Sequence, residues 1–143
     1  METLEKLFKS WKGGARFWAG DRPEGRVGQM PRIIAAKLGY PTALVDPFDH
    51  GGLVDLTWAQ AAHVLAVAGT VGLAYHRWIP REGALKEARK ALKDMGHDAV
   101  FLSNGLWSEG ANSWNPMSSA TFDCGLIGFD AEKAFIFWVE EED

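Results

Sequence analysis

The chain has 143 residues and a formal net charge of −4, and 47% of its residues are hydrophobic against 24% charged. This composition excludes a disordered chain, and the length fits one domain with one well-formed core. A single cysteine excludes an internal disulfide and a zinc site built from several cysteines. We therefore expect one compact domain over residues 1–143, in a reducing, cytoplasmic setting.

The first predicted element is an amphipathic helix. Apolar residues recur at three- and four-residue steps from Leu4 to Trp18, which places them on one helical face. Gly13-Gly14 weakens this helix, so we expect it to run to about Trp11 and then to break or continue loosely. Such a helix usually packs its aromatic residues on the core of its own domain, although basic residues beside aromatics also suit a membrane surface or a nucleic acid.

The middle of the chain predicts helices and strands in alternation. A Gly- and Pro-rich loop over residues 20–28 precedes them. A capping box, Thr57 with Gln60, marks the start of one helix. The predicted elements are helices over 31–38, 57–67 and 83–95 and strands over 42–45, 71–79 and 98–102. Each strand–helix–strand unit should cross over right-handed and pair its strands in parallel.

A hairpin closes the chain, with residues 121–129 pairing with 134–139 across the turn 130–133. Residues 134–139 are apolar on both faces, so this strand should lie inside the sheet. The sequence therefore predicts a single α+β domain. Its sheet is mixed, with a βαβαβ-like middle and a C-terminal antiparallel hairpin, and helices pack on it.

Residues 56–75 contain no Asp, Glu, Lys or Arg. Its length would nominally span a bilayer, but Gln60, His63 and two glycines interrupt it and much of its apolar content is alanine. We interpret it as a buried helix followed by a buried strand, and we expect no membrane partner.

The charge is unevenly distributed. Residues 1–100 carry a net charge of +3 and residues 101–143 a net charge of −7. Half of the acids in the second segment are the last four residues, Glu140, Glu141, Glu142 and Asp143. This acidic end disfavours nucleic acid and anionic lipid and favours a basic partner. The alternative is a solvated terminus that aids solubility.

The long loop over residues 103–119 is the first candidate site. It holds Trp107 and Trp114 together with Asn104 and Asn112 in a Gly- and Ser-rich segment. Loops of this length are uncommon unless functional, and Trp with Asn is typical of protein-contact surfaces. Two alternatives stay open: the tryptophans stack on a base or sugar ring, or they fold back and cap the core.

The second candidate site combines Asp46, Asp49 and His50 in a loop that ends in a glycine pair. These side chains could hold a divalent metal or share acid–base work. The alternative is an ordinary solvated turn, because Asp-Pro and Gly-Gly are common in loops. We expect no bound metal and no cofactor here.

The sequence carries no diagnostic catalytic motif, and three functional hypotheses remain. We favour a non-catalytic protein-binding module, a stoichiometric inhibitor or neutraliser of a basic protein partner comparable to immunity or anti-defence proteins. The second hypothesis is a small metal-assisted hydrolase or a transferase that works at the Asp46, Asp49 and His50 loop. The third is a small-ligand binder that stacks a nucleotide on Trp107 or Trp114. The first hypothesis assigns partner contact to Asn104, Trp107, Asn112, Trp114 and Glu140 to Asp143.

Overall fold

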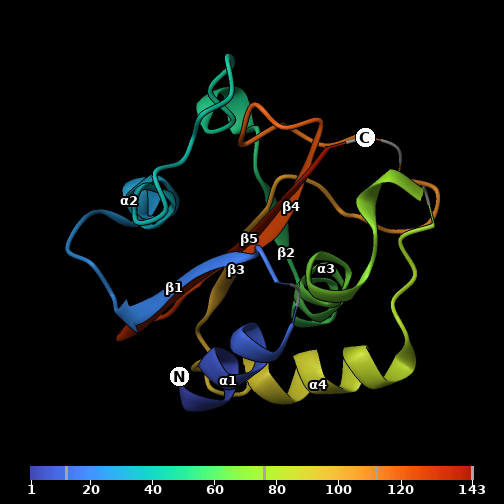
Figure 1. Cartoon of the computed structure of the whole chain (residues 1–143). Helices are drawn as coiled ribbons and strands as arrows, with labels where there is room; N and C mark the ends of the chain where they lie inside the picture. Colours follow the sequence, from blue (N-terminus) through green and yellow to red (C-terminus); the bar gives the residue numbers. More distant parts are fainter. Residues whose placement is uncertain (12, 76, 112, 143) are drawn as a thin grey trace.

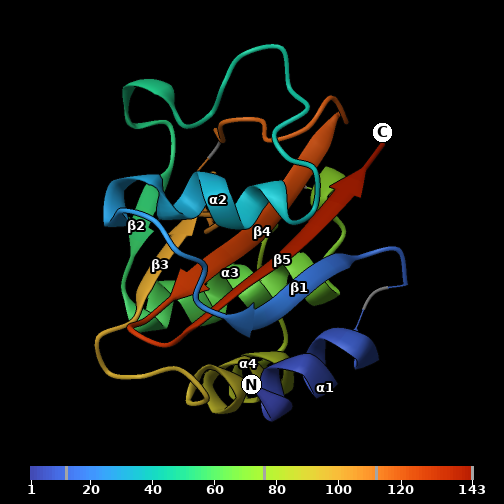
Figure 2. The same cartoon turned by 90° about the vertical axis from the view of Figure 1, so that its left-hand side faces the viewer.

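The computed structural model describes residues 1–11, 13–75, 77–111 and 113–142. Its centre is an antiparallel sheet of five strands, seen nearly edge-on in Figure 1, and the strand order β1-β5-β4-β3-β2 can be followed in Figure 2. The strands are β1 (Arg16–Asp21), β2 (Val54–Leu56), β3 (Val100–Ser103), β4 (Phe122–Phe129) and β5 (Lys133–Glu141). The helices are α1 (Glu2–Ser10), α2 (Met30–Ala36), α3 (Trp58–Thr70) and α4 (Glu82–Leu92), with short 3-10 turns η1 (Val27–Gln29), η2 (Asp49–Gly51) and η3 (Leu73–Tyr75).

The sheet separates two apolar cores. Helix α2 lies across one face, and α1, α3 and α4 lie on the other side (Figure 2). Strand β5 contributes to both cores, because Phe135 and Phe137 point to the α3 side while Ile136 and Trp138 point to the α2 side. The prediction that this strand lies inside the sheet is confirmed, since β5 pairs with β1 on one edge and β4 on the other.

The α+β class is confirmed, but the mixed sheet is wrong, because every strand pair in the described residues is antiparallel. Residues 42–45 form no strand, and residues 43–45 are bends. Residues 71–79, also predicted as a strand, contain η3, and the Trp78 indole Nε1 donates to the Leu73 carbonyl at 3.1 Å. Trp78 of this segment is buried in the core, and none of the described strand pairs includes the segment.

The N-terminal prediction is correct for the helix and wrong beyond it. Helix α1 ends at Ser10, and its buried Leu4, Leu7 and Phe8 pack on the domain's own core, as expected. The helical spacing continued to Trp18, but Arg16–Asp21 form the edge strand β1. This strand extends into the loop that was predicted over residues 20–28. The switch to strand follows from pairing with β5, which the helical spacing does not reveal.

The other helices follow their sequence signals. The Thr57 hydroxyl accepts from the Gln60 amide at 3.1 Å, and the Gln60 side chain accepts from the Thr57 amide at 2.9 Å, so the capping box is confirmed. Helix α3 continues to Thr70, slightly beyond the predicted end. No helix in the described residues is long and apolar enough to cross a membrane.

Candidate functional site

Two long loops meet at one end of the sheet. Loop 41–53 leads into β2, and loop 104–121 joins β3 to β4. The Thr42 amide donates to the Met117 carbonyl at 2.9 Å, and the Asn115 side-chain amide donates to the Gly52 carbonyl. The two candidate loops are thus hydrogen-bonded to each other, in a sheet whose described strand pairs are antiparallel. The loops meet because the start of β2 lies beside the end of β3.

A buried carboxylate organises the second loop. Asp123, at the start of β4, is fully buried and accepts from five groups. These are the amides of Met117 and Ser118, the Ser118 hydroxyl, the Trp138 indole and the Asn104 side-chain amide, at 2.9–3.2 Å. Burial raises the pKa of the Asp123 carboxyl, against the hydrogen bonds, which lower it.

Asn104 extends this network toward the loop tip. Its side-chain amide also donates to the Asp123 backbone carbonyl at 2.9 Å, and its Oδ1 accepts from the Trp107 indole Nε1 at 3.0 Å. Asn104 is fully buried. The predicted contact residue Asn104 therefore lies beneath the surface and holds the loop in place.

Trp107 is the most constrained residue of the loop. It is only 1% exposed and has a φ of 50°, a left-handed conformation that is unusual outside glycine. Its carbonyl accepts from His63 Nε2 of α3 at 2.5 Å. Its ring lies edge to face with Trp78, with a centroid distance of 4.7 Å. Trp107 thus caps the core, and its ring faces are not available to a stacking ligand.

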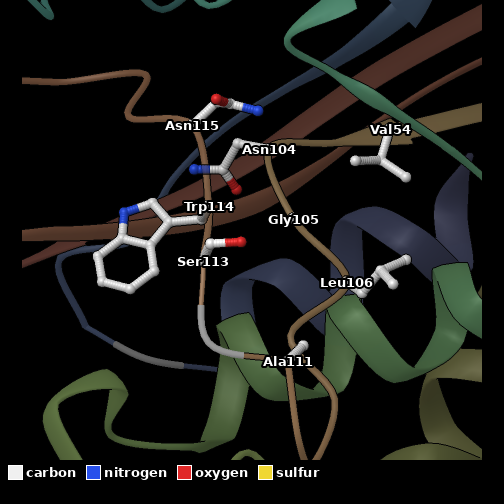
Figure 3. A pocket seen from close by; sticks show the side chains of 8 residues that line it. All are labelled: Val54, Asn104, Gly105, Leu106, Ala111, Ser113, Trp114 and Asn115. Atoms are coloured by element: carbon white, nitrogen blue, oxygen red, sulfur yellow. The ribbon is translucent and has the colours of Figure 1, made fainter.

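Trp114 is half-buried beside it. Its ring stacks on Phe122 with centroids 5.3 Å apart and lies 5.1 Å from the ring of Trp107. It also lines a hollow of about 250 Å³ between the two arms of the loop (Figure 3). The arms run side by side because the Asn115 amide donates to the Asn104 carbonyl at 2.8 Å.

Leu106 is an exposed large hydrophobic residue of this loop. It is 38% exposed, directly before the buried Trp107. Leu106 lines the hollow that Trp114 also lines, and it lines a second hollow of about 230 Å³ together with Ala59, Gln60 and His63 of α3. Sequence reasoning missed Leu106, because a leucine within a Trp-rich loop suggests core.

The acidic strand end is held in place by hydrogen bonds. The Tyr40 hydroxyl donates to Glu140 at 2.8 Å, and burial raises the pKa of Tyr40, so the donor keeps its proton. The Leu73 amide donates to Glu141 at 3.0 Å, and the Thr121 hydroxyl donates to Glu142 at 2.7 Å. Asp143, predicted with them, lies outside the described residues, as does Asn112.

In the alternative site at residues 46–50, both aspartates form ion pairs with Arg32. Arg32 Nη1 lies 2.7 Å from the Asp46 carboxylate, and Arg32 Nη2 lies 3.9 Å from that of Asp49. The Phe48 amide and the Arg32 guanidinium hold the pKa of Asp46 below its usual range. The His50 side chain lies outside the described part of the structure. No group of three or more His, Cys, Asp or Glu residues in the described part is placed to hold a metal ion.

Comparison of the chain with family models, with curated proteins and with solved structures gave no match.

Proposed function

We propose that this chain is a non-catalytic protein-binding module that occupies one basic partner stoichiometrically, as an inhibitor or neutraliser does. The proposed contact surface comprises Leu106, the two hollows beside it, the exposed part of Trp114 and the acidic end of β5. In this proposal Trp107 and Asn104 support the surface from below.

One observation carries the proposal: a strained and buried Trp107 fixes an outward-facing Leu106. A non-glycine residue in a sparsely populated conformation costs about 1–3 kcal/mol and persists only where surrounding contacts enforce it. Here His63, Asn104 and Trp78 enforce it. A loop held in one conformation before binding loses little entropy when a partner docks, which raises affinity without additional contacts.

The acidic strand end supports a basic partner. Glu141 pairs with Phe122 across β4 and β5, and the Phe122 ring stacks on Trp114, which lines the first hollow. The fixed carboxylate of Glu141 therefore lies close to the loop of Leu106 and Trp114. Charges at the rim of an interface mainly accelerate association, and they do so in a salt-dependent way.

The test is a comparison of baits in a pull-down from the native lysate, followed by reconstitution with the purified partner. The baits are the parent chain, Leu106→Asp and the control Leu44→Asp, which changes a more exposed leucine on the other loop. We expect a basic protein that the parent and the control retain and that Leu106→Asp loses. Calorimetry should then give one partner per chain, with association that slows as salt increases.

The proposal fails if no retained protein depends on Leu106, or if the reconstituted complex is not stoichiometric. Far-UV circular dichroism of each bait shows that a lost partner does not reflect an unfolded chain.

A further inference from the structure

A separate apolar hollow lies between the first turn of α3 and the last turn of α4. Its volume is about 300 Å³, and Trp58, Ala59, Arg89, Leu92 and Lys93 line it. This volume is at the lower end of the range for small-molecule sites, which are mostly apolar with a few placed polar groups.

The aromatic wall of this hollow is fixed before any ligand arrives. Trp58 is 40% exposed, yet its ring lies edge to face with Phe101, with a centroid distance of 4.8 Å and an angle of 76°. The capping box of Thr57 and Gln60 holds the turn of α3 on which Trp58 lies. A bound apolar group would therefore cover a ring that already has its final orientation.

Two cations border the apolar wall. Arg89, in the last turn of α4, and Lys93, the C-cap residue of that helix, are four positions apart and both line the hollow. Arg89 pairs with Glu82 at 3.4 Å, but both side chains are more than half exposed, so this ion pair is weak and easily exchanged. The rim thus offers positive charge to a ligand.

We propose that this hollow binds a small apolar anion, an alkyl or aryl carboxylate, with its apolar part on Trp58 and its carboxylate between Arg89 and Lys93. Because the rim is positively charged, we expect an anion to bind more tightly than a neutral or cationic amphiphile of the same shape. The proposal does not rest on the proposed protein partner, because it concerns Trp58, Arg89 and Lys93 and the opposite charge, although Ala59 also lines the second hollow beside Leu106.

The test is a titration of the full chain, labelled with ¹⁵N, with decanoate below its micellar concentration, monitored by the indole N–H signals. The spectrum of Trp58→Phe identifies the Trp58 signal by its loss. We expect decanoate to shift this signal saturably, and decyltrimethylammonium, with the same tail and the opposite charge, to bind at least about tenfold more weakly.

Two double variants separate the rim from general charge. Arg89→Gln with Lys93→Gln should abolish the preference for decanoate, whereas Lys86→Gln with Lys90→Gln, on the same helix but outside the hollow, should leave it unchanged. The proposal is overturned if both amphiphiles bind equally, if the Trp58 signal does not move, or if the two double variants behave alike.

Discussion

Replacing Trp107 and replacing Leu106 should have opposite consequences, although the two residues are adjacent. Trp107 is buried and Leu106 is 38% exposed. Trp107→Ala removes a fully buried indole, which costs about 3–5 kcal/mol, and deprives Asn104 Oδ1 of its indole donor, which adds about 1 kcal/mol. The sum is a large part of the stability of an ordinary domain, which is about 5–15 kcal/mol. Leu106→Ala should cost only about 0.5 kcal/mol, because its side chain is at the surface.

The assay is urea denaturation of each variant, monitored by far-UV circular dichroism, with partner binding measured on the folded chains. Trp107→Phe serves as a second variant, because it keeps an apolar ring and should lose only about 1–2 kcal/mol through the missing indole bond. We expect Leu106→Ala to keep the parent midpoint and to lose binding, and Trp107→Phe to lower the midpoint and keep binding.

The reasoning is refuted if Trp107→Ala unfolds at the parent urea concentration. Its ring would then not support the loop, and Trp107 would return to the role of a direct contact. A Leu106→Ala chain that binds the partner as tightly as the parent would contradict the predicted role of Leu106 in binding.

Three further predictions concern the scaffold. Gly125→Ala places a methyl group against the Trp138 ring and the backbone of β5, so it should destabilise the chain by about 1–3 kcal/mol or more in urea denaturation. Deleting residues 134–143 removes the β5 positions that pair with both neighbours and should abolish cooperative unfolding in a thermal scan; a truncated chain that melts near the parent temperature would contradict the single cooperative domain. The pKa of Asp46 is lowered by the hydrogen bond from the Phe48 amide and by Arg32, so the stability that these contacts contribute is present above the ordinary Asp pKa and is lost as pH falls through the lower folded pKa. A carboxyl NMR titration that gives an ordinary or raised pKa for Asp46 would contradict this.

The elements that could be predicted from sequence are those with a local signal. Residues 134–139 are apolar on both faces of the predicted strand, which indicates a strand covered on both sides. Strand β5 is such a strand. The capping box at Thr57 is likewise a property of four consecutive residues. Both signals report on the chain itself and need no knowledge of distant neighbours.

The elements that were mispredicted depend on distant partners. Strand β1 is fixed by pairing with β5 at the other end of the chain, and its own residues also fit a helical spacing. Residues 71–79 have strand-forming composition, but the described structure offers them no neighbouring strand. The composition of this segment therefore indicated a strand, but its conformation is determined by packing in the core.

The candidate loop was found from its length and composition, but its support was not. Asp123 is an isolated acid in a strand sequence, and the groups that donate to it come from Asn104, Met117, Ser118 and Trp138. No spacing rule connects these residues. The buried state of Trp107 could not be decided either, because exposed and buried tryptophans look alike in a sequence.

The length of this loop is the remaining argument for a role beyond connection. Strands β3 and β4 are antiparallel neighbours, and such strands can be joined by a two-residue turn. The chain instead inserts residues 104–121 and stabilises them with the buried carboxylate of Asp123 and the strained backbone of Trp107. A buried carboxyl group and a strained residue both cost stability, and a two-residue turn would need neither. In the proposed function, both serve to hold Leu106 outward beside the two hollows, as we expect of a contact surface.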